Sequence, residues 1–169
     1  MKSTKTLLAA LALSSALFGA AASPSYAGPE VNTAIGGVIV GGKPAPGLAV
    51  HGFDPVAFFT DSKPVQGDAN FATTYKEATY RFASQEHLDA FKADPAKYVP
   101  AYGGYCAFGV SVGKKFDGDP RFWSIVNGKL YLNLDKGIAE TFAKDVPGNL
   151  KKAEANWPGI EAKLPSEIK

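Results

Sequence analysis

The sequence predicts an α+β fold, in which a small, mainly antiparallel sheet packs against several short helices in a single domain. Three observations favour this class. Short apolar segments of strand length alternate with helix-like segments that begin at capping residues. Asn127-Gly128 separates two apolar segments, and this pair supplies the positive φ angles of a tight hairpin turn. No internal repeat or heptad pattern runs through the chain.

The strand candidates are short and bounded by turn residues. The clearest is the hairpin 122–126 and 129–133, in which Trp123 and Ile125 alternate with Leu130 and Leu132 across the turn to give one apolar face. A second pair, 71–75 and 79–82, flanks a turn at 76–78. Further strands are expected at these segments: 38–40, 56–59 and 106–112.

Three segments have the pattern of helices. Ser84 is expected to cap a helix that carries Glu86 in its first turn, presents Leu88 and Phe91 on one face and stops before Pro95. The spacing of the apolar residues predicts a helix over 136–144 and another over 147–156, which Pro158 ends or restarts. Residues 98–105 are expected to form a loop.

The first residues resemble a cleavable secretory signal. Lys2 and Lys5 precede an uncharged run over residues 7–20, and small residues flank Tyr26, so we expect cleavage after Ala27, with Ala22 as the alternative. An uncleaved membrane anchor is the competing interpretation, but the run is shorter than the ~20 residues that span a bilayer. We therefore divide the chain into a signal (1–27), a Gly/Pro-rich leader (28–50), a domain (51–160) and a tail (161–169). The expected location is periplasmic or secreted.

Charge and cysteine content exclude some functions. Without the signal, 16 basic and 16 acidic residues remain, and no block of like charges predicts nucleic-acid binding. The single cysteine, Cys106, cannot form an internal disulfide.

Few residues can carry chemistry. The sequence contains no paired-cysteine motif, phosphate-binding loop or nucleophile elbow. His87 is either a packed, hydrogen-bonded histidine or a metal ligand, and His51 is either a solvated loop residue or a ligand. Cys106 is a buried apolar residue, a thiolate ligand or a redox-sensitive thiol. Three aspartates are either metal ligands or turn residues: Asp54, Asp117 and Asp119.

Aromatic residues are concentrated around Cys106 in the sequence. We interpret them as the main core, with a small ring-lined pocket as the alternative; they are Tyr98, Tyr102, Tyr105, Phe108 and Trp123.

Several blocks of sequence resemble exported YHS-domain proteins. Residues 52–59 (GFDPVAFF) are similar to the Gly-Tyr-Asp-Pro-Val-Ala-Tyr-Phe opening of that family. Residues 80–84 (YRFAS) with Phe91 and 94–98 (DPAKY) resemble the heart of the domain. The later blocks are 102–107 (YGGYCA), 128–133 (GKLYLN) and 156–158 (NWP).

The resemblance implies a link to metal handling, because related domains hold metals through three cysteines. The corresponding positions here are Ala57, Ala83 and His87, so two of the three thiolates are missing. We therefore expect, first, a non-enzymatic exported module whose ligand is copper or zinc, copper first, held by His87, Cys106 and His51. The alternatives are a metal-free domain that contacts a protein or a small molecule, and a thiol redox protein that uses Cys106.

Overall fold

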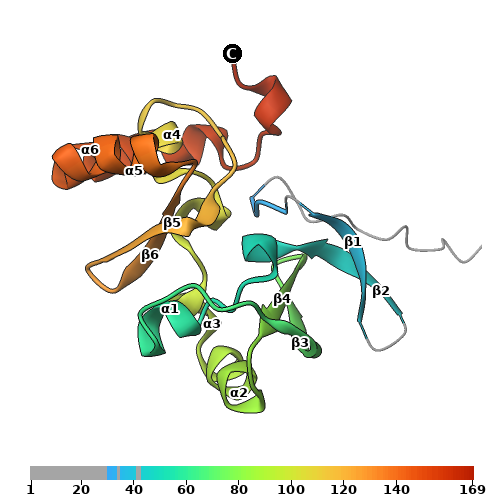
Figure 1. The fold of residues 1–169 in the computed structure, drawn as a ribbon. Coiled ribbons are helices and arrows are strands. Elements are labelled where there is room, and N and C mark those ends of the chain that lie inside the picture. The colour runs from blue at the N-terminus through green and yellow to red at the C-terminus, as the bar shows by residue number, and fades with distance from the viewer. Residues whose placement is uncertain (1–29, 34, 41–42) are drawn as a thin grey trace, which may run out of the picture.

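The computed structural model describes residues 30–33, 35–40 and 43–169, and the predicted signal lies outside them. The α+β prediction is confirmed: two small, mostly antiparallel sheets pack with six α-helices in one compact domain. In Figure 1 the four-stranded sheet lies with α1, α2 and α3 in one half, and α4, α5 and α6 gather beside the β5–β6 hairpin in the other. No helix among the described residues is long and apolar enough to cross a membrane.

The larger sheet has the strand order β1-β2-β4-β3. Its strands are β1 (Ile35–Val40), β2 (Lys43–Leu48), β3 (Asp68–Tyr75) and β4 (Ala78–Phe82). The pair β3–β4 confirms the second predicted hairpin, and its turn places Lys76 and Glu77 at positive φ, as a type I′ turn requires. The leader contains two antiparallel strands, β1 and β2, where the sequence predicted one short strand.

The predicted strand at 56–59 is wrong, because this segment forms α1 (Ala57–Thr60) after the turn η1 (Ala49–Gly52). The carboxylate of Asp54 accepts hydrogen bonds from the backbone N–H groups of Val56 and Ala57, and this favours a helical turn over an extended chain. The predicted Ser84 cap is confirmed at the start of α2 (Gln85–Ala93).

The segment that follows α2 contains two short helical turns that the sequence did not predict. They are α3 (Pro95–Tyr98), capped by Asp94, and η2 (Ala101–Gly104), in which Tyr102 and Gly103 have positive φ. The predicted strand at 106–112 is also wrong: residues 107–111 form α4 (Ala107–Ser111). Cys106 Sγ accepts from the N–H of Gly109 and Asn133 accepts from that of Phe108, so both side chains cap this helix.

The predicted Asn-Gly hairpin is confirmed as β5 (Asp119–Val126) and β6 (Lys129–Asn133). Helix α5 (Lys136–Lys144) has the predicted bounds. The prediction that Pro158 ends or restarts a helix is wrong, since α6 (Val146–Ile160) continues through it before the turn η3 (Pro165–Glu167). Pro158 lies in the last turn, where it removes one hydrogen bond, and the burial of Ile160 favours the continued helix.

Strand β6 connects the two halves of the core. Leu130 and Leu132 are fully buried in the main core, which includes residues of α2 and β4. Tyr131 points to the other side of the strand and packs with Phe142 and Leu150 of α5 and α6. This alternation follows from the two-residue period of a strand. The aromatic residues near Cys106 are therefore divided among several clusters instead of forming one core.

Candidate functional site

His87 is held by a buried carboxylate. Its Nδ1 lies 2.6 Å from Oδ2 of Asp54, whose side chain is completely buried. The same oxygen accepts from the N–H of Ala83, and the other oxygen accepts from two N–H groups at the start of α1. Because an ionised carboxylate only accepts, Nδ1 donates to it, and in the neutral imidazole Nε2 then carries the lone pair. The structure therefore favours the packed, hydrogen-bonded interpretation of this histidine.

Nε2 of His87 lies 3.4 Å from the hydroxyl of Thr60. Asp54, His87 and Thr60 thus form a hydrogen-bonded series of acid, imidazole and hydroxyl, as in hydrolase triads. However, the Thr60 hydroxyl also lies 2.8 Å from the carboxylate of Asp61. This carboxylate would repel the negative charge that develops during acyl transfer, so the geometry does not favour a catalytic hydroxyl.

His51 belongs to a separate cluster. Its Nε2 lies 2.9 Å from Oδ1 of Asp117, and the same oxygen accepts a hydrogen bond of 2.6 Å from the side chain of Asn32. Hydrogen bonding to Asp117 raises the pKa of His51, and the interaction lowers the pKa of Asp117. Asn32 also bonds to the carbonyls of Gly103 and Gly104, so this cluster ties the leader to η2.

Cys106 is a capping residue with only 1% of its surface exposed. Its sulfur accepts from Gly109 and lies 3.8 Å from Oδ1 of Asn133. Burial raises the pKa of the thiol, which disfavours the thiolate that redox chemistry and metal ligation require. The interpretation as a small buried residue describes Cys106 best.

The structure does not bring the three expected ligands into one donor group. His51, His87 and Cys106 each have partners of their own. Within residues 30–33, 35–40 and 43–169, no group of three or more His, Cys, Asp or Glu side chains is placed to hold a metal ion. The residues present therefore do not fit a three-donor copper or zinc centre.

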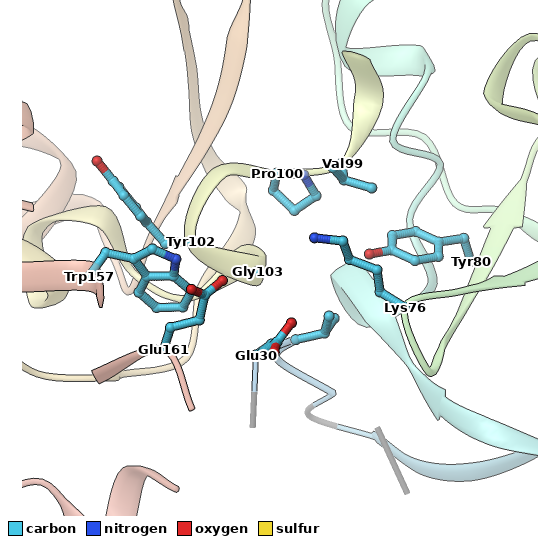
Figure 2. A pocket seen from close by; sticks show the side chains of 10 residues that line it. Glu30, Lys76, Tyr80, Val99, Pro100, Tyr102, Gly103, Trp157 and Glu161 are labelled. Carbon is cyan, nitrogen blue, oxygen red and sulfur yellow. The ribbon is translucent and has the colours of Figure 1, made fainter. Parts of the chain in front are cut away.

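A cavity of about 170 Å³ lies between the two halves of the molecule. We call it the Tyr80 cavity (Figure 2); the residues that matter most are Lys76, Tyr80, Pro100, Tyr102, Trp157 and Glu161. The carboxylate of Glu30 and the side chain of Val31 complete its wall. It thus draws residues from the leader, the β3–β4 turn, η2 and α6.

Tyr80 is the unusual residue of this cavity. Only 2% of its surface is exposed, and its hydroxyl points into the space (Figure 2). None of the hydrogen bonds among the described residues involves this hydroxyl, and it is not one of the fully buried polar atoms without a partner, so it opens on the cavity. Burial raises the pKa of Tyr80 well above its ordinary value, so the hydroxyl stays neutral. A hydroxyl that opens on the cavity can bond to a molecule there.

A second cavity, of about 260 Å³, lies on the other side of η2. We call it the Tyr131 cavity, and it is also bordered by Lys97, Lys129 and Glu154. The two cavities share a wall of Val99, Pro100, Tyr102 and Trp157. The sequence offered a ring-lined pocket as an alternative. Of the aromatic residues named there, Tyr102 does line both cavities, and the ring beside it is that of Trp157, far along the chain.

Lys115 supports this wall from behind. Its buried ammonium group donates to the carbonyls of Glu161 and Lys163 at 2.6 and 2.8 Å, just beyond α6. It also lies 5.1 Å from the centre of the Trp157 ring. Burial lowers the pKa of Lys115, while nearby Glu161 and Glu30 oppose this shift. The lysine thus fixes the position of the indole and of the adjacent carboxylate.

Sequence reasoning missed Tyr80, Lys76 and Trp157 as site residues. Tyr80 lies on the same face of β4 as Ala78 and Phe82, so it has the pattern of a core residue. Trp157 directly follows the helix predicted over 147–156, and its neighbours depend on tertiary packing. Asp54 carried a detectable signal, since an Asp before a Pro and an apolar segment is a typical turn residue.

The comparison with protein families gives one match. Residues 56–102 match the family model of the YHS domain. The chain therefore contains a YHS domain, as the resemblance predicted, and the match runs from Val56 at the start of α1 into η2. No curated protein and no solved structure matches the chain.

Proposed function

We propose that this chain is an exported, non-enzymatic YHS-type binding module that holds a small molecule in the Tyr80 cavity. The single observation that supports it is the hydroxyl of the buried Tyr80, which points into the cavity and has no partner among the described residues. An intramolecular or ligand hydrogen bond contributes roughly 0.5–1.5 kcal/mol net. A ligand that accepts from this hydroxyl gains that contribution.

The size and lining of the cavity support a small ligand. Its volume of about 170 Å³ is close to that of an engineered apolar cavity, roughly 150 Å³, that binds benzene. The rings of Tyr102 and Trp157 lie on one side with Glu161, and the ring of Tyr80 lies on the other with Lys76 (Figure 2). A cavity that combines apolar walls with a few placed polar groups is typical of small-molecule sites.

Two-dimensional NMR with ¹⁵N-labelled protein tests the proposal. We would titrate a library of molecules no larger than a substituted benzene and follow the amides of the β3–β4 turn and the indole N–H of Trp157. Tyr80→Phe should weaken the binding of hydrogen-bonding probes, whereas Tyr131→Phe, the same change in the other cavity, should not. If no probe shifts these signals, or if both variants behave alike, the proposed site is wrong.

Export is the second part of the proposal. The two lysines, the apolar run over 7–20 and the small residues before Gly28 support it. N-terminal sequencing of protein recovered from the periplasm or the medium should show Gly28 as the first residue. Recovery of the full chain, beginning at Met1, from the cytoplasm alone would contradict export.

A second candidate function is metal binding through His87 alone, completed by donors from outside the chain. The observation that favours it is the Asp54–His87 pair, since metal-ligating imidazoles commonly donate their other N–H to a carboxylate. Imidazole suits copper and zinc. Equilibrium dialysis with Cu(I), Cu(II) and Zn²⁺ should then show retention that His87→Gln abolishes and His51→Gln does not. Absence of retained metal for all three ions would dismiss this candidate.

A further inference from the structure

The charged groups of the Tyr80 cavity are separated by sign. In Figure 2, Lys76 and Tyr80 border the space on one side, and Trp157 and Glu161 border it on the other, with Glu30 below. From this polarity we infer that the ligand is a small zwitterion, with a carboxylate at the Lys76–Tyr80 side and an ammonium group at the Glu161–Trp157 side. The inference rests on the proposed function, because it names the chemical class of ligand for the same cavity.

The Lys76–Tyr80 side offers two hydrogen-bond donors. The amino group of Lys76 reaches the cavity from the tight β3–β4 turn, where its positive φ fixes the direction of the chain. The neutral hydroxyl of Tyr80 donates beside it from β4. Hydrogen bonds that involve a charged group are roughly twice as strong as neutral ones. A carboxylate is a small group that can accept from both.

The opposite side suits a cation. The carboxylates of Glu161 and Glu30 both reach the cavity, and the rings of Trp157 and Tyr102 form its wall. Carboxylates and aromatic faces together recognise ammonium groups, quaternary ones included. Lys115 also lies close to Trp157, but its ammonium group is already bonded to two backbone carbonyls.

The overall charge favours a zwitterion over a single ion. Of the residues that line the cavity, Lys76 is a cation and Glu30 and Glu161 are anions, while Lys115 lies behind the wall on the Glu161 side. A lone anion would leave the two carboxylates, and a lone cation would leave Lys76, without a counter-charge in the ligand. A zwitterion that aligns with the two sides leaves neither unpaired.

Calorimetric titration with three molecules of nearly the same shape tests the inference. Glycine betaine carries both charges, choline only the cation, and 3,3-dimethylbutyrate only the anion. Betaine should bind about tenfold or more tightly than either relative, because each relative loses one charge-assisted interaction. Glycine, as a zwitterion with a primary ammonium group, extends the test to smaller ligands.

Single substitutions test which residues contact each end of the ligand. Tyr80→Phe and Lys76→Met should weaken betaine and 3,3-dimethylbutyrate about tenfold and leave choline unchanged, whereas Glu161→Gln should weaken betaine and choline only. Glu154→Gln, which changes a carboxylate of the Tyr131 cavity, is the matched control and should alter nothing. If choline or 3,3-dimethylbutyrate binds as tightly as betaine, the zwitterion is wrong and the cavity remains a binding site. If neutral fragments bind but no charged probe does, the zwitterion inference is wrong and the proposed function stands. If neither kind of probe binds, both are wrong.

Discussion

The buried carboxylate of Asp54 fixes the imidazole of His87 and the first turn of α1 at the same time. Four donors converge on its two oxygens, one from the imidazole and three from backbone N–H groups at the start of α1 and before α2. Asp54 therefore joins segments that are about thirty residues apart in the chain, and its charge is balanced by hydrogen bonds without contact with water.

Replacing Asp54 with Asn should destabilise the fold. The amide nitrogen of Asn would face either backbone N–H groups or the His87 N–H, and one buried donor would lose its acceptor. We expect the free energy of unfolding to fall by about 3 kcal/mol, measured by urea denaturation. The matched control is Asp61→Asn, an exposed change that should stay within about 0.5 kcal/mol. Equal stability of the two variants would show that the Asp54 bonds contribute little.

The His51–Asp117 pair should make stability depend on pH. Because the folded pKa of His51 is raised, its contribution is complete below the ordinary imidazole value of about 6.5 and is lost as pH rises through the folded value. The lowered pKa of Asp117 adds stability that is lost as pH falls through its folded value. Both residues are partly exposed, so the effect should be below about 1 kcal/mol.

An NMR titration of the imidazole signals measures this coupling directly. In Asp117→Asn the pKa of His51 should return toward its ordinary value. In Asp119→Asn, which removes a more distant charge, the pKa should fall less. An unchanged His51 titration in Asp117→Asn would mean that the pair does not form in solution.

Cys106 should react with thiol reagents only after unfolding. Its sulfur is buried and its pKa is raised, so the native protein offers neither access nor thiolate. With Ellman's reagent at pH 8, we expect a rate at least about a hundredfold below that of the urea-unfolded chain. A reaction rate of the native protein close to that of the unfolded chain would support the interpretation of Cys106 as a redox-sensitive thiol.

Gly103→Ala should release the leader from η2. A β-carbon at this position would lie 1.8 Å from the carbonyl oxygen of Glu30, and the φ of +62° adds strain. Gly128→Ala is the control, because Gly128 also has positive φ but its β-carbon would meet nothing within 4 Å. The control should lose about 1–2 kcal/mol from the φ strain alone, with the leader still protected from hydrogen exchange. Equal protection of residues 30–33 in both variants would contradict this contact.

Local sequence signals predicted much of the fold. Asn127-Gly128 gave the hairpin, and Ser84 gave the start of α2, because turn and cap preferences depend on a few neighbouring residues. The errors at 56–59 and 106–112 have a shared cause. Both segments are apolar and short, and two side chains outside them, those of Asp54 and Asn133, accept N–H groups near their starts and favour helical turns. Periodicity alone does not contain that information.

The candidate site was less predictable than the fold. The sequence predicted that three residues share one metal ion: His51, His87 and Cys106. In the structure each of them has separate partners. The Tyr80 cavity instead joins residues from the leader to α6 whose types are ordinary for a core. Such a cavity arises from the packing of distant elements, which the residue types do not determine.

Strand β6 has a consequence for how the chain can be divided. The YHS match ends at residue 102, yet Leu130 and Leu132, some thirty residues later, fill the interior of the matched segment. The opposite side of the same strand anchors α5 and α6 through Tyr131. A fragment cut after residue 102 would expose a hydrophobic surface where these leucines had been. In this protein the segment that matches the family model is therefore shorter than the stretch of polypeptide that builds its core.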